Sequence, residues 1–153
     1  MNSRRAPIAL ALAASLALPG CGSDAQDSPL IGQTWQVVAV HTDPLWPGEL
    51  PADAAGKAEL RVSGSSLRAT TGCAPLRARV ERGDQDPDRL TLHEVELGEV
   101  GACDGGSRHV HDQLTGLLTE GAQFDVRMFG EREATLTVVG DAVDRASIRV
   151  MAL

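Results

Sequence analysis

The sequence predicts an α+β fold: a small antiparallel, barrel-like β-sheet with one amphipathic helix at about residues 107–120. Two observations lead to this prediction. Short runs of alternating apolar and polar residues, typical of half-buried strands, fill most of the chain after residue 30 and are separated by turn residues. One segment has helical spacing instead, and a single helix among seven or eight short strands favours a curled or closed sheet.

The expected strands follow one another at short intervals. They cover residues 34–41, 58–62, 66–71, 76–80, 90–100, 123–128, 134–139 and 146–151. Ser63-Gly64-Ser65 separates two of these runs and predicts a hairpin turn. Within residues 90–100 the apolar side chains change parity after Leu92, so we expect a turn or bulge near His93-Glu94.

The helix is expected between Ser107 and Glu120. Its apolar residues recur at i, i+4, i+7 and i+8, which places them on one face: Val110, Leu114, Leu117 and Leu118. Ser107 has a side chain suited to the N-cap, and Gly121 is suited to the position that follows a helix C-terminus.

The first 20 residues have the pattern of a cleavable secretory signal peptide. Arg4 and Arg5 precede an apolar run from Ala6 to Leu18, and a small residue follows before the expected cut. The 13 residues of this run span about 20 Å as a helix, whereas a bilayer core is roughly 30 Å thick. We therefore expect a signal at residues 1–20 and no permanent membrane span.

Leu18-Pro19-Gly20-Cys21 resembles the lipobox of bacterial lipoproteins, in which the cysteine receives a lipid. The resemblance implies lipidation at Cys21 and an exported protein that is anchored to the cell membrane and faces outside the cytoplasm; several acyl chains hold such a protein stably. Residues 21–29 are small and polar, so we expect a lipidated N-terminus and a flexible tether, with a reach of about 15 Å for its last eight residues. A secreted protein without lipid is the alternative.

Composition argues against nucleic acid as a partner. Loss of Arg4 and Arg5 with the signal reduces the 14 Lys and Arg to 12 against 21 acidic side chains, a net charge of −9. This charge opposes binding to nucleic acid and to anionic lipid surfaces, which attract clusters of Lys and Arg. The chain has two Trp, two Phe and no Tyr, too few aromatic rings for a base-stacking platform.

Several short motifs resemble the META (HslJ-like) domain family. Gly32-Gln33-Thr34-Trp35 resembles its opening, Gly72-Cys73 its central motif, and Gly101-Ala102-Cys103 the segment before its helix. Phe124 and Leu136-Thr137-Val138 then follow in the family's order. The resemblance covers residues 30–153, which we take as one META-like domain.

This resemblance implies a small antiparallel barrel with a helix, carried on an envelope lipoprotein, without a shared catalytic chemistry. Two departures leave the match incomplete: Ala74 stands where the family has Asn, and the Arg-Met before the second cysteine is absent. The resemblance therefore concerns fold and location, and leaves activity open.

The cysteine count predicts a disulfide. Lipidation uses Cys21, so two cysteines remain, Cys73 and Cys103, in an oxidising compartment. Two separate buried thiols are the alternative, because the sequence does not fix the distance between them. A thiolate–imidazole pair of Cys103 with His109 or His111 is a third, less favoured interpretation.

No cofactor or metal is expected. On a helix, His109 and His111 lie about 200° apart and cannot hold one ion together, so we expect both to face solvent. The acidic run at residues 84–88 resembles the start of a calcium loop, but Arg89 and Val95 occupy the positions of the required Gly and Glu. A solvated acidic turn is the expectation, with Ca²⁺ binding left open.

Trp46 is the candidate partner-binding residue. It lies in a long loop bracketed by Pro44 and Pro47, and exposed tryptophans in loops often bind partners. The favoured interpretation is a lid packed over the end of the barrel, and a binding residue is the alternative. For function we expect a non-catalytic module that binds an envelope or protein partner; a small barrel inhibitor of an exogenous hydrolase is the second hypothesis, and an enzyme the third.

Overall fold

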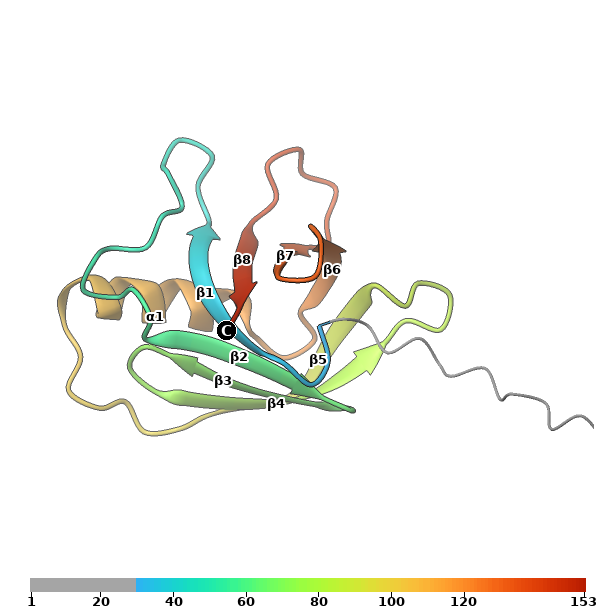
Figure 1. Ribbon diagram of the computed structural model, residues 1–153, viewed down its shortest axis with the longest axis horizontal. Coiled ribbons are helices and arrows are strands. Elements are labelled where there is room, and N and C mark those ends of the chain that lie inside the picture. Colours follow the sequence, from blue (N-terminus) through green and yellow to red (C-terminus); the bar gives the residue numbers. More distant parts are fainter. Residues whose placement is uncertain (1–29) are drawn as a thin grey trace, which may run out of the picture.

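Figure 1 shows the computed structural model, which describes residues 30–153 as a closed barrel of eight antiparallel strands with one helix. The strands are β1 (Thr34–His41), β2 (Ala58–Ser63), β3 (Ser66–Thr71), β4 (Pro75–Arg82), β5 (Arg89–Leu97), β6 (Gln123–Met128), β7 (Glu133–Val138) and β8 (Ser147–Ala152). Helix α1 (Gly105–Leu117) lies between β5 and β6. Each strand pairs with the next in the chain, and β8 closes the barrel against β1. The predicted fold class is confirmed.

The barrel core follows from the alternating pattern of the strands. In β3 and β4 every second residue is buried, and the residues between face solvent. The largest fully buried side chains include Trp35 and Phe124. The indole N–H of Trp35 donates to the carbonyl oxygen of Leu30 at 2.9 Å, so its one polar atom is satisfied inside the core.

Two bulges adjust the curvature of the barrel. The predicted irregularity near His93-Glu94 is confirmed: β5 has one extra residue opposite Arg77–Arg79, and Glu94 has a φ of 52°. The Glu94 carboxylate accepts a hydrogen bond from Arg79 at 2.9 Å. The second bulge lies in β1 opposite β8; beyond it Val40 packs in the core, whereas Ala39 is buried beneath the β1–β2 connection, where it forms a bridge with Glu49.

The hairpin between β2 and β3 has the predicted turn. Ser63 pairs with Ser66, and the two-residue loop between them starts with Gly64 at a φ of 57°. Positive φ at the first loop residue is the preference of glycine in the type II′ turn. This tight turn fixes which residues of β2 and β3 lie opposite each other.

Helix α1 begins and ends earlier than predicted. Its N-cap is Asp104, whose side chain makes no capping hydrogen bond, and Ser107 lies inside the first turn and is buried. The carboxylate of Asp53 replaces a local cap, because its Oδ2 accepts a hydrogen bond from the N–H of Gly106 at 2.8 Å. A side chain at Gly106 would collide with Asp53 and Pro51, so glycine permits this approach.

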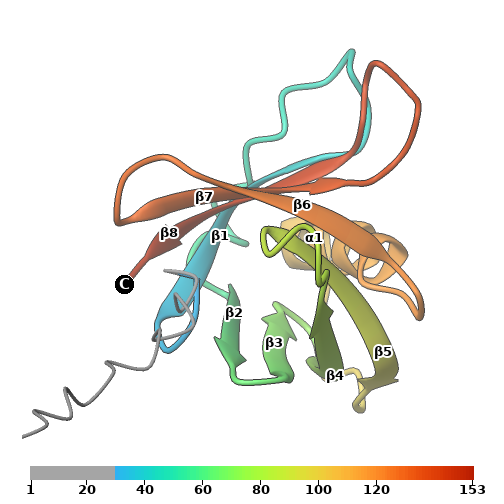
Figure 2. The same cartoon turned by 90° about the vertical axis from the view of Figure 1, so that its right-hand side faces the viewer.

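The chain connections divide the barrel into two sides. In Figures 1 and 2 the tip of the β1–β2 connection and the β7–β8 connection project on one side, and β2, β3 and β4 form the opposite side. Residues 30–153 include no helix long and apolar enough to cross a bilayer. The predicted signal peptide, the lipidation site at Cys21 and the tether lie outside the described residues.

Candidate functional site

The β1–β2 connection holds Trp46 out in solvent. Trp46 is 72% exposed and its neighbour Leu45 is 86% exposed, so the interpretation of Trp46 as a lid is wrong. The reason is a local turn: the Oδ1 of Asp43 accepts from the N–H of Leu45 at 2.9 Å, and its carbonyl oxygen accepts from the N–H of Trp46 at 3.3 Å. This turn fixes the backbone of the loop tip, from which the exposed indole projects.

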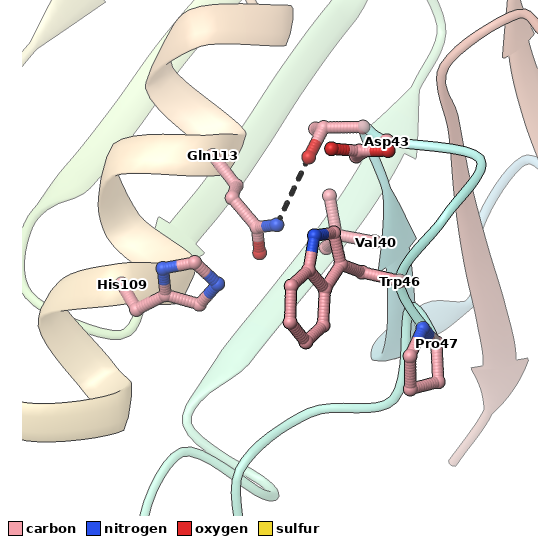
Figure 3. A pocket seen from close by; sticks show the side chains of 7 residues that line it. Val40, Asp43, Trp46, Pro47, His109 and Gln113 are labelled. Atoms are coloured by element: carbon pink, nitrogen blue, oxygen red, sulfur yellow. Dashed lines mark hydrogen bonds between the residues drawn. The ribbon is translucent and has the colours of Figure 1, made fainter.

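A cavity of about 420 Å³ lies between this loop and helix α1 (Figure 3). Its lining residues come from β1, the loop and the helix: Val40, Thr42, Asp43, Trp46, Pro47, His109 and Gln113. The Nε2 of Gln113 donates to the Oγ1 of Thr42 at 3.1 Å and so ties the helix to the loop. In Figure 3 the rings of His109 and Trp46 lie on opposite sides of this space.

A second, smaller hollow of about 130 Å³ also borders Trp46. It shares Thr42, Asp43 and Trp46 with the first and adds Asp144 and Arg145 from the β7–β8 connection. Trp46 therefore lines two hollows, and both contain polar side chains that a partner could contact.

The two helix histidines have different environments. His109 is exposed and lines the large cavity, as predicted for a solvent-facing residue. His111 is buried, and its Nδ1 lies 2.6 Å from the Oγ1 of Thr71, so the prediction that it faces solvent is wrong. The buried face includes polar members that apolar spacing misses: Ser107, Val110, His111 and Leu114 follow i, i+3, i+4 and i+7.

The predicted disulfide joins Cys73 and Cys103, whose Cα atoms are 5.5 Å apart. It links the β3–β4 turn to the segment before helix α1. The Sγ of Cys73 also lies 3.3 Å from the carbonyl oxygen of Ser107, in the first turn of the helix. A disulfide-bonded Cys103 has no thiol to ionise, which removes the thiolate–imidazole alternative.

The acidic run at residues 84–88 is followed by Arg89, whose charge offsets part of the charge of the run. Arg89 lies 3.7 Å from the Oδ2 of Asp86 and 2.8 Å from the Oδ1 of Asp125. Within residues 30–153 no group of three or more His, Cys, Asp or Glu side chains is placed to hold a metal ion.

Sequence reasoning missed one surface feature, a row of arginines across the outside of β2, β3 and β4. Arg61 is paired with Arg68, and Arg68 is paired with Arg77, so the three lie side by side on adjacent strands. We call these three residues the arginine row. The sequence contained the information needed to predict part of this row, because the two-residue turn at Gly64-Ser65 places residue 61 opposite residue 68.

Comparisons with known proteins found no match to this chain among protein-family models, curated proteins or solved structures.

Proposed function

We propose that this protein is an exported lipoprotein, anchored through Cys21, whose non-catalytic barrel binds an envelope or protein partner through the Trp46 loop. The exposed indole of Trp46 carries this proposal. Tryptophan is enriched among the residues that dominate binding energy at protein interfaces. The resemblance of residues 30–153 to META (HslJ-like) domains agrees with an envelope module.

The surroundings of Trp46 suit recognition better than catalysis. The cavity beside it has two titratable lining residues, Asp43 and His109. One carboxylate oxygen of Asp43 is already used to hold the loop turn. The remaining lining groups can orient a partner by hydrogen bonds and ring stacking, which are binding interactions.

A small inhibitor of an exogenous hydrolase is the second hypothesis. The observation that favours it is the shape of the loop, which projects from the barrel and is held by backbone bonds such as Val40 N–H to Gly48 O at 2.7 Å. A loop that is already ordered loses little entropy when it enters a cleft.

Site-directed photo-cross-linking in intact cells tests the binding role. A photoreactive side chain at Leu45 should cross-link to one discrete partner, and the Trp46→Ala change should abolish that product. The matched control is the same group at Phe129, an exposed residue in the β6–β7 turn. Equal cross-linked products from both positions would refute recognition by the loop. Inhibition of a purified hydrolase by the protein would support the second hypothesis.

Membrane fractionation tests the anchor separately. Cys21→Ser should release the protein from the membrane fraction, because the acyl chains are lost. A variant that stays with the membranes after a high-salt wash would refute the anchor without affecting the role of Trp46.

A further inference from the structure

The arginine row places three positive charges on adjacent strands, where like charges ordinarily repel each other. Arg61, Arg68 and Arg77 are exposed, and each lies directly opposite the next across neighbouring strands. Like charges in such cross-strand positions destabilise a sheet. Without the signal peptide the chain has 12 basic and 21 acidic side chains, a net charge of −9 that opposes binding to an anionic surface, so this grouping of cations runs against its overall composition.

Within residues 30–153, five arginines outside the row have a carboxylate partner, whereas Arg82, Arg127 and Arg132 have none. Arg79, Arg89, Arg108, Arg145 and Arg149 each form an ion pair with a carboxylate. No member of the arginine row forms an ion pair within residues 30–153. The Nη1 of Arg61 donates one long hydrogen bond, to the Oγ1 of Thr34 at 3.4 Å.

Two carboxylates border the row, and neither forms an ion pair with it within residues 30–153. Glu59 shares a surface hollow with Arg61 and Arg68, and Glu96 lies opposite Arg77 on β5. A further hollow of about 240 Å³ is lined by Arg61, Arg68 and two serines, Ser63 and Ser66. The guanidinium groups and the hydroxyl of Ser63 can donate several hydrogen bonds to a phosphate, whereas the hydroxyl of Ser66 donates to the carbonyl oxygen of Ser63 at 3.0 Å.

The chain enters the barrel beside this surface. Ile31 forms a bridge with Val62, and the N–H of Gly32 donates to the carbonyl oxygen of Val62 at 2.9 Å. Val62 follows Arg61 in β2. Only eight residues separate Cys21 from Leu30, a root-mean-square reach of about 15 Å for a flexible chain. A lipid on Cys21 would therefore hold the row within reach of the headgroups.

We propose that the arginine row is a membrane-facing surface that binds the phosphate groups of anionic lipids in the membrane to which the protein is tethered. The inference rests on the proposed lipid anchor. Contact through β2, β3 and β4 turns the tip of the Trp46 loop away from the membrane, because the two lie on opposite sides of the barrel (Figures 1 and 2). The row orients the barrel, and the loop is then presented to its partner.

Fluorescence quenching of the full lipidated chain in vesicles tests this orientation. The chain has no Tyr and two Trp, of which Trp35 is buried and Trp46 exposed, so Trp46 reports the loop side. The matched reporter is Trp46→Phe with Ser65→Trp, which moves the exposed indole to the β2–β3 turn. The vesicles carry a headgroup spin label as the quencher. One set consists of phosphatidylcholine alone, and the other also contains about a third phosphatidylglycerol, an anionic lipid.

With phosphatidylglycerol, we expect the reporter at position 65 to be quenched about threefold more than Trp46. The two reporters should be quenched equally when all three arginines are replaced by glutamine. The same result is expected in about 0.5 M salt, which shortens the Debye length to roughly 4 Å. Near-UV circular dichroism checks that the triple variant keeps its fold. A chain that stays on the vesicles with equal quenching of both reporters would overturn the docking surface alone; a chain that leaves both kinds of vesicle would overturn the anchor as well.

Discussion

The Nδ1 of His111 and the Oγ1 of Thr71 lie 2.6 Å apart in the interior of the protein, and this contact joins helix α1 to the end of β3. The same hydroxyl donates to the carbonyl oxygen of Ala74 at 3.0 Å and accepts from the N–H of Ala74 at 3.1 Å. One threonine therefore organises the β3–β4 turn and satisfies a histidine that the helix would otherwise bury unpaired.

Thr71→Val should lower stability because it keeps the shape but removes the hydroxyl. An unsatisfied buried polar group costs about 1–3 kcal/mol, and both His111 and Ala74 lose a partner. Urea unfolding measures the change. Thr137→Val is the matched control, since Thr137 lies in a strand and is half-buried. Equal stability of the two variants would show that the contact contributes nothing.

Asp53 should stabilise the N-terminus of helix α1 from more than 50 residues away in the chain. Asp53→Ala removes the carboxylate that accepts the N–H of Gly106, and losing such a cap costs about 1 kcal/mol. Asp104→Ala is the control, because Asp104 occupies the N-cap position without a side-chain capping bond. Thermal melting should distinguish them; a larger loss for Asp104→Ala would contradict the assignment.

These two contacts mark the limit of prediction from sequence. The strands, the hairpin at Gly64 and the bulge at Glu94 were predictable, because periodicity and turn chemistry are local. The cap from Asp53 was not, since it depends on how the barrel brings a loop to a distant helix. The buried His111 was missed because the helix face was defined by apolar residues alone.

The candidate site shows the same division. The proline-bracketed loop indicated that Trp46 could bind a partner. Whether its ring packs on the barrel or is exposed to solvent depends on the turn at Asp43 and on helix α1, which is bonded to the loop through Gln113. The cavity that includes His109 and Gln113 requires α1 to lie against the β1–β2 connection, a relationship between segments more than 60 residues apart.

Trp46→Ala should leave the melting temperature almost unchanged, because Trp46 is 72% exposed. Trp35→Ala is the contrasting variant: Trp35 is fully buried, and loss of a buried tryptophan costs about 3–5 kcal/mol. A large drop in melting temperature for Trp46→Ala would restore the lid interpretation and remove the basis of the proposed binding role.

Loss of the Cys73–Cys103 disulfide should destabilise the domain strongly. The bond closes a loop with a sequence separation of 30, for which the chain-entropy estimate is roughly 3.5 kcal/mol. Denaturant unfolding of Cys73→Ala with Cys103→Ala, against the oxidised protein, measures it. Peptide mapping without reduction, after free thiols are blocked, provides the independent check: two alkylated cysteines would disprove the bond.

Arg68→Thr should raise the stability of the isolated protein, unlike most surface substitutions. Arg68 lies between Arg61 and Arg77, so its removal relieves two cross-strand repulsions, each worth about 0.2–1 kcal/mol, and threonine suits a strand. The control is Arg79→Thr, which removes an arginine paired with Glu94 at 2.9 Å and should be neutral or slightly destabilising. Thermal melting at low salt compares the variants, and the gain from Arg68→Thr should shrink as salt screens the charges. If Arg68→Thr instead melts at a lower temperature than Arg79→Thr at every salt concentration, the three arginines do not repel one another. The proposal that they bind an anionic membrane surface would then lose its main physical support.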